Sequence, residues 1–254
     1  MEILFILIYQ PIYNILIGLY DIFGDFGIAI IVMTIAIKLL LVPLSKKQIE
    51  SQKEMQELQP KIKELQKKYK DDKEQLSKKT MALYKEHKIN PAAGCLPLII
   101  QMIIFITMYR VIINLAENDA LTIHAENLYS FIPVPEVING MFLGIMNLAE
   151  PSILLAVITA AAQFYQLKMM QAKTAANEDK KAEVAKKDDA PDFATIMQKQ
   201  MLFIVPIMTL FIGIKFPSGL ALYWLTSTVF MIAQQWYIIY KEKMNSKEIK
   251  SKTK

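Results

Sequence analysis

The sequence has few of the residue types on which enzymatic and metal sites depend. Its 254 residues include one cysteine and two histidines. A single cysteine, Cys95, excludes an internal disulfide and a cysteine metal cluster. The HExxH, GxSxG and Walker motifs are all missing. We therefore expect no enzymatic activity, no catalytic residue, no metal and no cofactor.

Basic residues are missing from two long stretches, 1–25 and 116–150. Of the 29 Lys and Arg residues, 13 lie in 46–93, seven in 168–199 and six in 241–254. Because Lys and Arg concentrate on the cytoplasmic side of membrane proteins, the three basic blocks are predicted to face the cytoplasm. The two stretches without basic residues are then outside. This orientation places the N-terminus outside and the C-terminus in the cytoplasm.

Apolar residues make up 54% of the chain and gather into runs long enough to cross a bilayer. We predict an all-α polytopic membrane protein with five transmembrane helices. In chain order, the sequence predicts an extracytoplasmic interfacial amphipathic helix (1–25), a first span (26–45), a cytoplasmic helical hairpin (46–93), a second span (94–116), an extracytoplasmic loop (117–151), a third span (152–170), a cytoplasmic linker (171–196), a fourth span (197–216), a fifth span (218–240) and a basic cytoplasmic tail (241–254).

Three segments carry finer expectations. Pro11, Gln10 and Asn14 interrupt the first apolar run, which favours a helix lying on the membrane over a short or tilted span. Within the second extracytoplasmic stretch, 137–148 is predicted to be a short interfacial helix. The segment 171–192 is rich in Lys, Ala and Asp with little apolar content, which predicts disorder.

One charge, Lys38, lies inside the first predicted span, where it costs about 2.5–3.5 kcal/mol at a helix centre on insertion scales. Thr34 shares its helix face. Gln101, Gln163 and Gln166 lie inside other predicted spans. One interpretation is that Lys38 snorkels to the inner interface while the amides join helices. The other is that these residues line one wet cavity open to the cytoplasm. No carboxylate lies inside any predicted span, which favours the cavity.

The polar block 46–93 has an apolar seam with heptad-like spacing. Asp71 and Asp72 fall where a turn is expected, so we predict two antiparallel helices, 46–70 and 73–88, with Pro60 kinking the first. A solvated charged helix without a partner is the alternative. The seam, which would bind cargo or partners, consists of Met55, Leu58, Ile62, Leu65, Tyr69, Leu76 and Leu83.

Four motifs together resemble the YidC/Oxa/Alb family of membrane protein insertases, in particular its short bacterial form. They are IAIKLLLVPLSKKQ, MQELQPKIKELQKKY, MALYKEHKINPAAGCLPLIIQM and FPSGLALYWLTSTVFMIAQQ. They cover about 26–241 in the order of the family. The resemblance implies a multi-pass protein of the bacterial cell membrane that inserts and helps fold newly made membrane proteins. It also implies five spans around a positively charged hydrophilic groove, open to the cytoplasm and on one side to lipid.

The resemblance also implies roles for individual residues. The family carries a groove arginine in its first conserved span, and Lys38 stands at that position. Thr34 and the pair Tyr223-Trp224 match positions associated with groove lining and substrate contact. Either Gln163 or Gln166 matches the groove glutamine of the third span. A lysine keeps the charge of the arginine but lacks its planar fork.

The implied mechanism is physical. Lys38 would attract the acidic tail of a cargo into the groove, and the apolar cargo segment would slide past the first and fifth spans into lipid. Expected partners are nascent membrane proteins and the bilayer, with the ribosome, the signal recognition particle, its receptor and the Sec translocon at the cytoplasmic face, and no DNA. Two other hypotheses remain: a secondary transporter or channel using Lys38 as an intramembrane charge, and a translocon partner without insertion activity.

Overall fold

The computed structural model describes residues 5–70, 72–87, 96–115, 127–133, 138–178 and 193–252. These residues are mostly helical, which confirms the predicted all-α class apart from one small hairpin of strands. The elements are η1 (Phe5–Tyr9), α2 (Gln10–Phe23), α3 (Phe26–Leu40), α4 (Val42–Lys68), α5 (Lys73–Glu86), α6 (Leu96–Leu115), β1 (Met141–Phe142), β2 (Met146–Asn147), α7 (Ile153–Glu178), α8 (Phe193–Lys215) and α9 (Ser218–Lys252).

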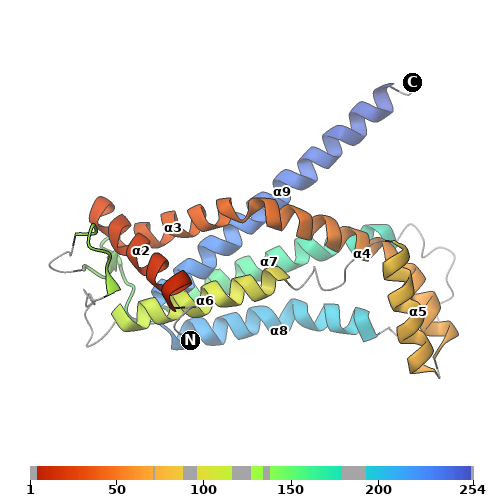
Figure 1. Cartoon of the computed structure of the whole chain (residues 1–254), viewed down its shortest axis with the longest axis horizontal. Helices are drawn as coiled ribbons and strands as arrows, with labels where there is room; N and C mark the ends of the chain where they lie inside the picture. Colours follow the sequence, from red (N-terminus) through yellow and green to blue (C-terminus); the bar gives the residue numbers. More distant parts are fainter. Residues whose placement is uncertain are drawn as a thin grey trace.

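An elongated bundle forms the body of the molecule (Figure 1). Helices α3, α6, α7 and α8 run roughly along its long axis, and α9 crosses the bundle obliquely. Helix α9 packs against α3, α6 and α7, whereas α8 packs mainly against α7. A Cβ atom added to Gly213 of α8 would lie 2.7 Å from the Cβ of Ala156 on α7, so the two backbones approach closely. The bundle is therefore organised around α7 and α9.

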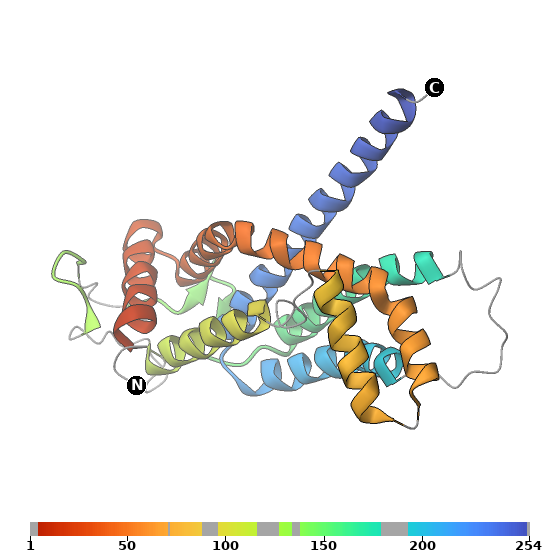
Figure 2. The same ribbon diagram turned by 45° about the vertical axis from the view of Figure 1, so that its right-hand side comes forward.

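Two described segments are long and apolar enough to cross a membrane by length and composition, Ile6–Phe23 and Ile153–Met170. Phe26–Leu40, Ile99–Leu115 and Gln200–Lys215 are shorter apolar helices. From the sequence, the segment Ile6–Phe23 is predicted to lie on the membrane, with a short or tilted span as the alternative. Its length and composition also fit that alternative. Figure 2 shows η1 and α2 running across the end of the bundle, not along its axis.

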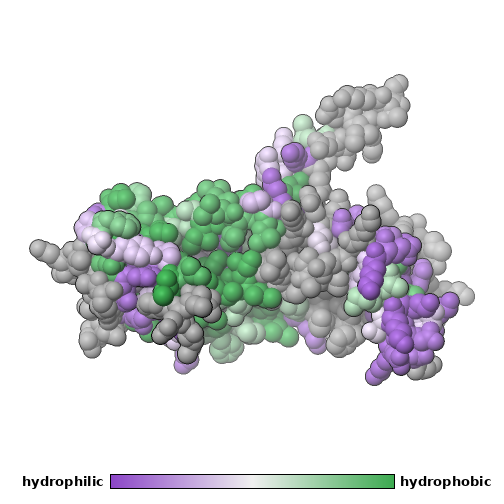
Figure 3. All heavy atoms as spheres, in the orientation of Figure 1, coloured by the Kyte–Doolittle hydropathy of each residue, from purple (hydrophilic) through white to green (hydrophobic). Residues whose placement is uncertain are grey.

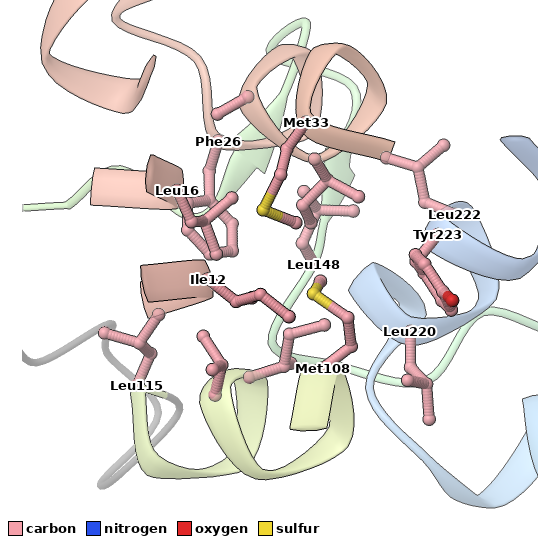
Figure 4. Close-up of a cluster of buried hydrophobic side chains, with 14 of the residues drawn as sticks. Ile12, Leu16, Phe26, Met33, Met108, Leu115, Leu148, Leu220, Leu222 and Tyr223 are labelled. Atoms are coloured by element: carbon pink, nitrogen blue, oxygen red, sulfur yellow. The ribbon is translucent and has the colours of Figure 1, made fainter. Parts of the chain in front are cut away.

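Buried apolar side chains concentrate at the end of the bundle where α2 lies. Tyr13, Phe26, Met33, Met108 and Leu220 are each at most 2% exposed. They come from α2, α3, α6 and α9 and point into one cluster, part of which Figure 4 shows. At this end, Gly24 ends α2 with a left-handed φ of 67°, and Asp25 caps α3 by accepting a hydrogen bond from the Ile28 N–H at 2.9 Å.

The helix predicted for 137–148 is wrong for the described part, 138–148. Strands β1 and β2 pair antiparallel there, with Met141 opposite Asn147 and Phe142 opposite Met146. The turn between them contains Gly144, whose φ of 69° a glycine adopts without strain. Leu143 also has a positive φ, 51°, and consecutive positive φ angles in the three-residue loop 143–145 favour a hairpin over a helix.

Contacts with distant residues hold this hairpin in place. Asp25 Oδ2 accepts a hydrogen bond from the Leu143 N–H at 2.7 Å. The ring of Phe142 lies on Gly27, where an added Cβ would come within 2.1 Å of it. These contacts join residues more than 100 positions apart, and the periodicity of the local sequence carries no sign of them.

The linker predicted for 171–196 is shorter than expected. Helix α7 continues to Glu178 and α8 begins at Phe193, so the predicted disorder is wrong for 171–178, and 179–192 lies outside the described residues. The sequence QAKTAANE is rich in alanine and other helix-forming residues, so it extends a helix that is already nucleated. Similarly, α9 continues through the predicted tail to Lys252 and projects from the bundle in Figure 1.

Helices α4 and α5 pack against each other at the opposite end from α2. Helix α4 contains Pro60, and Figure 2 shows a change of direction along it. Asp72 caps α5 by accepting from the Gln75 N–H at 2.9 Å. Leu58 and Ile62 are the buried residues of the predicted seam. The others are half-buried, namely Met55, Leu65, Tyr69, Leu76 and Leu83.

Candidate functional site

Lys38, in the last turn of α3, begins a chain of hydrogen bonds across the bundle. Its Nζ donates to Gln101 Oε1 on α6 at 2.8 Å. Gln101 Nε2 in turn donates to the Tyr223 hydroxyl on α9 at 2.9 Å. Three predicted site residues, from parts of the sequence up to 185 positions apart, therefore meet in one network.

Among the residues that the structure describes, Lys38 has no counter-ion. The side chain is 9% exposed, and besides Gln101 its Nζ lies 3.5 Å from Met231 Sδ. Both partners are uncharged. Carbonyl groups at the C-terminal end of α3 favour a cation there, but they do not cancel it. The site therefore presents a partly buried positive charge.

A second contact extends the site from α9 to α7. Trp224 Nε1 donates to Gln163 Oε1 at 2.6 Å. The indole also meets Phe105 of α6 edge to face, with ring centroids 5.0 Å apart. Tyr223 and Trp224 both contact α6, and Trp224 also contacts α7. Together they connect α6 and α7 through α9.

Thr34 and Gln166 are close in sequence to this network but are not hydrogen-bonded to it. Thr34 is buried one turn from Lys38, and its hydroxyl donates to the Ile30 carbonyl of its own helix at 2.6 Å. Gln166 is 4% exposed, and the described residues include no hydrogen-bond partner for its side chain. Of the two glutamines left open by the sequence, Gln163 is the one in contact with the predicted aromatic pair.

Sequence reasoning missed three contacts around the site. Gln234 Nε2 donates to Ser45 Oγ at 2.8 Å, which joins α9 to α4 on the hairpin side of Lys38. Thr159 Oγ1 lies 3.4 Å from the Ala221 carbonyl and so joins α7 to α9. Gln234, Ser45 and Thr159 are polar residues at or inside apolar runs, a signal that was available. Met231 carries no such signal, because methionine is ordinary in an apolar helix.

The arrangement has donors, acceptors and one cation, but no pair of groups suited to bond-making chemistry. Its polar side chains come from four helices and face one another inside an apolar bundle. Such a set can hold a polar or anionic chain segment by charge and hydrogen bonding.

Comparison with known proteins gives this geometry a context. A family model described as "60Kd inner membrane protein" matches residues 18–247, which is most of the chain. The chain belongs to this family. The resemblance read from the four motifs is thereby confirmed, and the family consists of inner membrane proteins that include the insertases named YidC.

Several relatives carry the name "Membrane protein insertase YidC". The protein of Fusobacterium nucleatum subsp. nucleatum is 35% identical over 220 residues, which cover 86% of this chain and 88% of the relative. The protein of Rickettsia rickettsii is 33% identical over 238 residues, which cover 92% of this chain and 39% of the relative. A crystal structure described as an active YidC insertase with its first transmembrane domain resolved aligns with a TM-score of 0.60 at 28% identity, covering 92% of this chain and 46% of that one.

The fraction of each relative's length that this chain covers differs widely. This chain spans about two-fifths of the length of the Rickettsia protein and of the Nitratidesulfovibrio vulgaris protein, which is 30% identical over 232 residues. It spans most of the Fusobacterium protein. The family model covers residues 18–247 and therefore every residue of the Lys38 network. What the whole relatives do is therefore a basis for a proposal about this chain.

Proposed function

We propose that this protein is a membrane protein insertase that inserts newly made membrane proteins and helps them fold. The observation that carries the proposal is the cation of Lys38 in a chain of the YidC family. It is 9% exposed, is hydrogen-bonded to Gln101 and has no counter-ion among the described residues. A buried charge of this kind is energetically costly, so its presence indicates a function. Attraction of an acidic chain segment is the function that this charge suits.

The proposed topology has five spans, formed by α3, α6, α7, α8 and the first part of α9. Helices η1 and α2 lie on the outer face, and α4, α5 and the end of α9 face the cytoplasm of a bacterial cell. Three observations support it: the distribution of Lys and Arg, the apolar surface over the bundle beside the hydrophilic surface of α5 in Figure 3, and the course of α2 across the bundle end in Figure 2.

In the proposed mechanism, Lys38 draws the acidic tail of the cargo into the inner half of the membrane. Two unit charges 4 Å apart interact by about 1 kcal/mol in water but by about 4 kcal/mol at the effective dielectric constant of 20 typical of a protein. Gln101, Tyr223 and Gln163 then offer hydrogen bonds in place of water. This shortens the dry path, along which each unpaired backbone group costs several kcal/mol.

The apolar cargo segment is proposed to leave past the first and fifth spans, α3 and α9, which pack against each other. Both helices expose apolar side chains, among them Leu39 on α3 and Val229 on α9. Helices α6 and α8 also expose apolar side chains, which offer a second route. These side chains are Ile99, Met102, Ile106 and Ile113 on α6, and Met201, Ile204, Met208 and Phe211 on α8.

Partners at the cytoplasmic face belong to the same proposal. The pair α4–α5 and the lysine-rich end of α9 both extend from the bundle in Figure 1. The hairpin is suited to contact cargo, the signal recognition particle, its receptor or the Sec translocon. The basic end of α9 is suited to ribosomal RNA, because lysines neutralise phosphates.

Reconstituted vesicles test this function. Purified protein in vesicles is offered a single-span cargo with an acidic outer tail, and protection of that tail from added protease is measured. We expect protection well above that in protein-free vesicles. No gain over empty vesicles, with the protein folded, would contradict independent insertion and favour a translocon partner. Flux of a solute or ion without insertion would favour a transporter or channel.

A further inference from the structure

Two basic residues lie outside both the cytoplasmic blocks and the Lys38 network. Arg110 is five residues before the end of α6, and Lys215 is the last residue of α8. Both side chains are exposed. Within the described part of the chain, neither has an acidic or hydrogen-bonding partner. In the proposed topology both lie towards the outer face, where the charge bias of membrane proteins disfavours them.

A ring contact shows that the outer ends of α6 and α8 meet. The rings of Tyr109 and Phe216 lie edge to face with centroids 5.1 Å apart. Tyr109 immediately precedes Arg110, and Phe216 immediately follows Lys215. One peptide unit spans about 3.8 Å, so both cations are anchored close to the same contact, one on each helix.

Each cation also follows an exposed apolar stripe. The α6 stripe consists of Ile99, Met102 and Ile106, followed on the same face by Arg110 and then by the exposed Ile113. The α8 stripe consists of Met201, Ile204, Met208 and Phe211, followed by Lys215. The steps of three and four residues keep every member on one side of its helix. Apolar surface therefore leads up to a positive charge on both helices.

The α8 stripe is long enough to cross one leaflet of a bilayer. The α8 stripe from Met201 to Lys215 rises about 21 Å at 1.5 Å per residue. One leaflet contributes about half of a hydrocarbon core about 30 Å thick. Arg110 lies about 7 Å below the end of α6, and its long side chain reaches outward by snorkelling. Both cations thus reach headgroup level, above apolar surface long enough for an acyl chain.

We propose that Arg110 and Lys215 form a binding site for an anionic phospholipid of the outer leaflet. Their cations hold the headgroup phosphate, to which a guanidinium donates two parallel hydrogen bonds. The acyl chains lie along the α6 and α8 stripes. The site rests on the proposed topology but not on insertion activity. A lipid fits better than an acidic cargo tail, because the surface directly below the cations is apolar and exposed.

Native mass spectrometry of the purified protein tests the site. The protein is released from micelles containing equal amounts of phosphatidylglycerol and phosphatidylcholine, and retained lipids are counted. For the wild type we expect preferential retention of phosphatidylglycerol. Arg110→Gln/Lys215→Gln should reduce that retention at least fivefold and leave phosphatidylcholine unchanged. Lys79→Gln, which removes one exposed charge on α5, is the control and should match the wild type.

Further variants and measurements distinguish a lipid site from a structural or cargo-binding role. Arg110→Lys keeps the charge and should retain more phosphatidylglycerol than Arg110→Gln, which a purely structural role would not predict. Circular dichroism checks that each variant is folded. Unchanged phosphatidylglycerol retention in the folded double variant would overturn the site. If insertion of acidic-tailed cargo also fell in that case, the pair would serve cargo. If wild-type protein retained the lipid but failed to insert cargo, the proposed function would fail and the lipid site would stand.

Discussion

The two ends of the bundle are held together in different ways. At the outer end, packed apolar side chains join α2, α3, α6 and α9, and Asp25 and Gly27 hold the β hairpin against them. At the inner end, a few polar contacts around Lys38 cross the bundle, and the α4–α5 pair buries only Leu58 and Ile62 among its described residues. We propose that the end at α2, the outer end of the proposed topology, stays closed and that the end at Lys38, its inner end, exchanges partners. Five predictions test this difference between the two ends, in order from the largest expected effect to the smallest.

The largest effect is expected at the inner end, on function. Lys38→Glu replaces the attracting charge by a repelling one, and we expect insertion of an acidic-tailed cargo to fall at least tenfold, as measured by protease protection in vesicles. Lys38→Arg, which keeps the charge, is the matched control and should retain most activity. Unimpaired insertion by folded Lys38→Glu would remove Lys38 from the mechanism and restore the snorkelling interpretation.

At the outer end, Gly27→Ala should lower stability without acting on the Lys38 network. The new Cβ would come within 2.1 Å of the Phe142 ring, so the hairpin must shift. We expect a loss of about 1–3 kcal/mol, measured by thermal melting in detergent. Gly18→Ala is the control, because its Cβ would meet Ile132 at 3.4 Å, an ordinary contact. Equal melting temperatures for the two variants would contradict the close packing.

Asp25→Ala tests the polar part of the outer end. Its carboxylate accepts from the Ile28 N–H and the Leu143 N–H, so alanine removes a helix cap and the hold on the β turn together. We expect a loss of about 1–2 kcal/mol in the same melting assay. Asp25→Asn keeps one acceptor oxygen and should lose less. An asparagine variant as unstable as the alanine variant would argue against this pair of hydrogen bonds.

A mutation in the α4–α5 pair should affect the stability of that pair only. Leu58 is 4% exposed in a two-residue core, so Leu58→Ala should cost about 1 kcal/mol, below the usual range for a large core. Hydrogen exchange should speed up in α4 and α5, while exchange in α3 and α9 stays the same. Leu76→Ala, at a half-buried seam position, is the milder comparison. Faster exchange throughout the bundle would show that hairpin and bundle are one cooperative unit.

The smallest effect on stability is expected at Tyr223. Tyr223→Phe removes the hydroxyl that accepts from Gln101 and leaves the buried ring in place. Interhelical hydrogen bonds in membranes average about 0.6 kcal/mol, so the melting temperature should barely change. Insertion should fall by about twofold to threefold, because 0.6 kcal/mol is less than half of the 1.4 kcal/mol that makes a factor of ten. A large drop in melting temperature would assign Tyr223 to the rigid end instead.

Much of the architecture was readable from local pattern. Apolar runs predicted helices now seen as α3, α6, α7, α8 and α9, and the seam spacing predicted a helix pair where α4 and α5 lie. The wrong predictions concern segments whose structure depends on residues outside them. Residues 138–148 form a hairpin that contacts Asp25 and Gly27. Residues 171–178 are helical because they continue α7.

The sequence alone determined that Lys38 is a charge in an apolar helix, and that Thr34, Gln101, Gln163, Gln166, Tyr223 and Trp224 are polar or aromatic candidates beside it. Spacing along one helix is local, so periodicity is enough to read it. Only the tertiary structure decided that Gln101 bridges Lys38 to Tyr223, that Gln163 and not Gln166 meets Trp224, and that Met231 is a neighbour of the charge. Those contacts join different helices, and their partners are set by how the helices pack against one another.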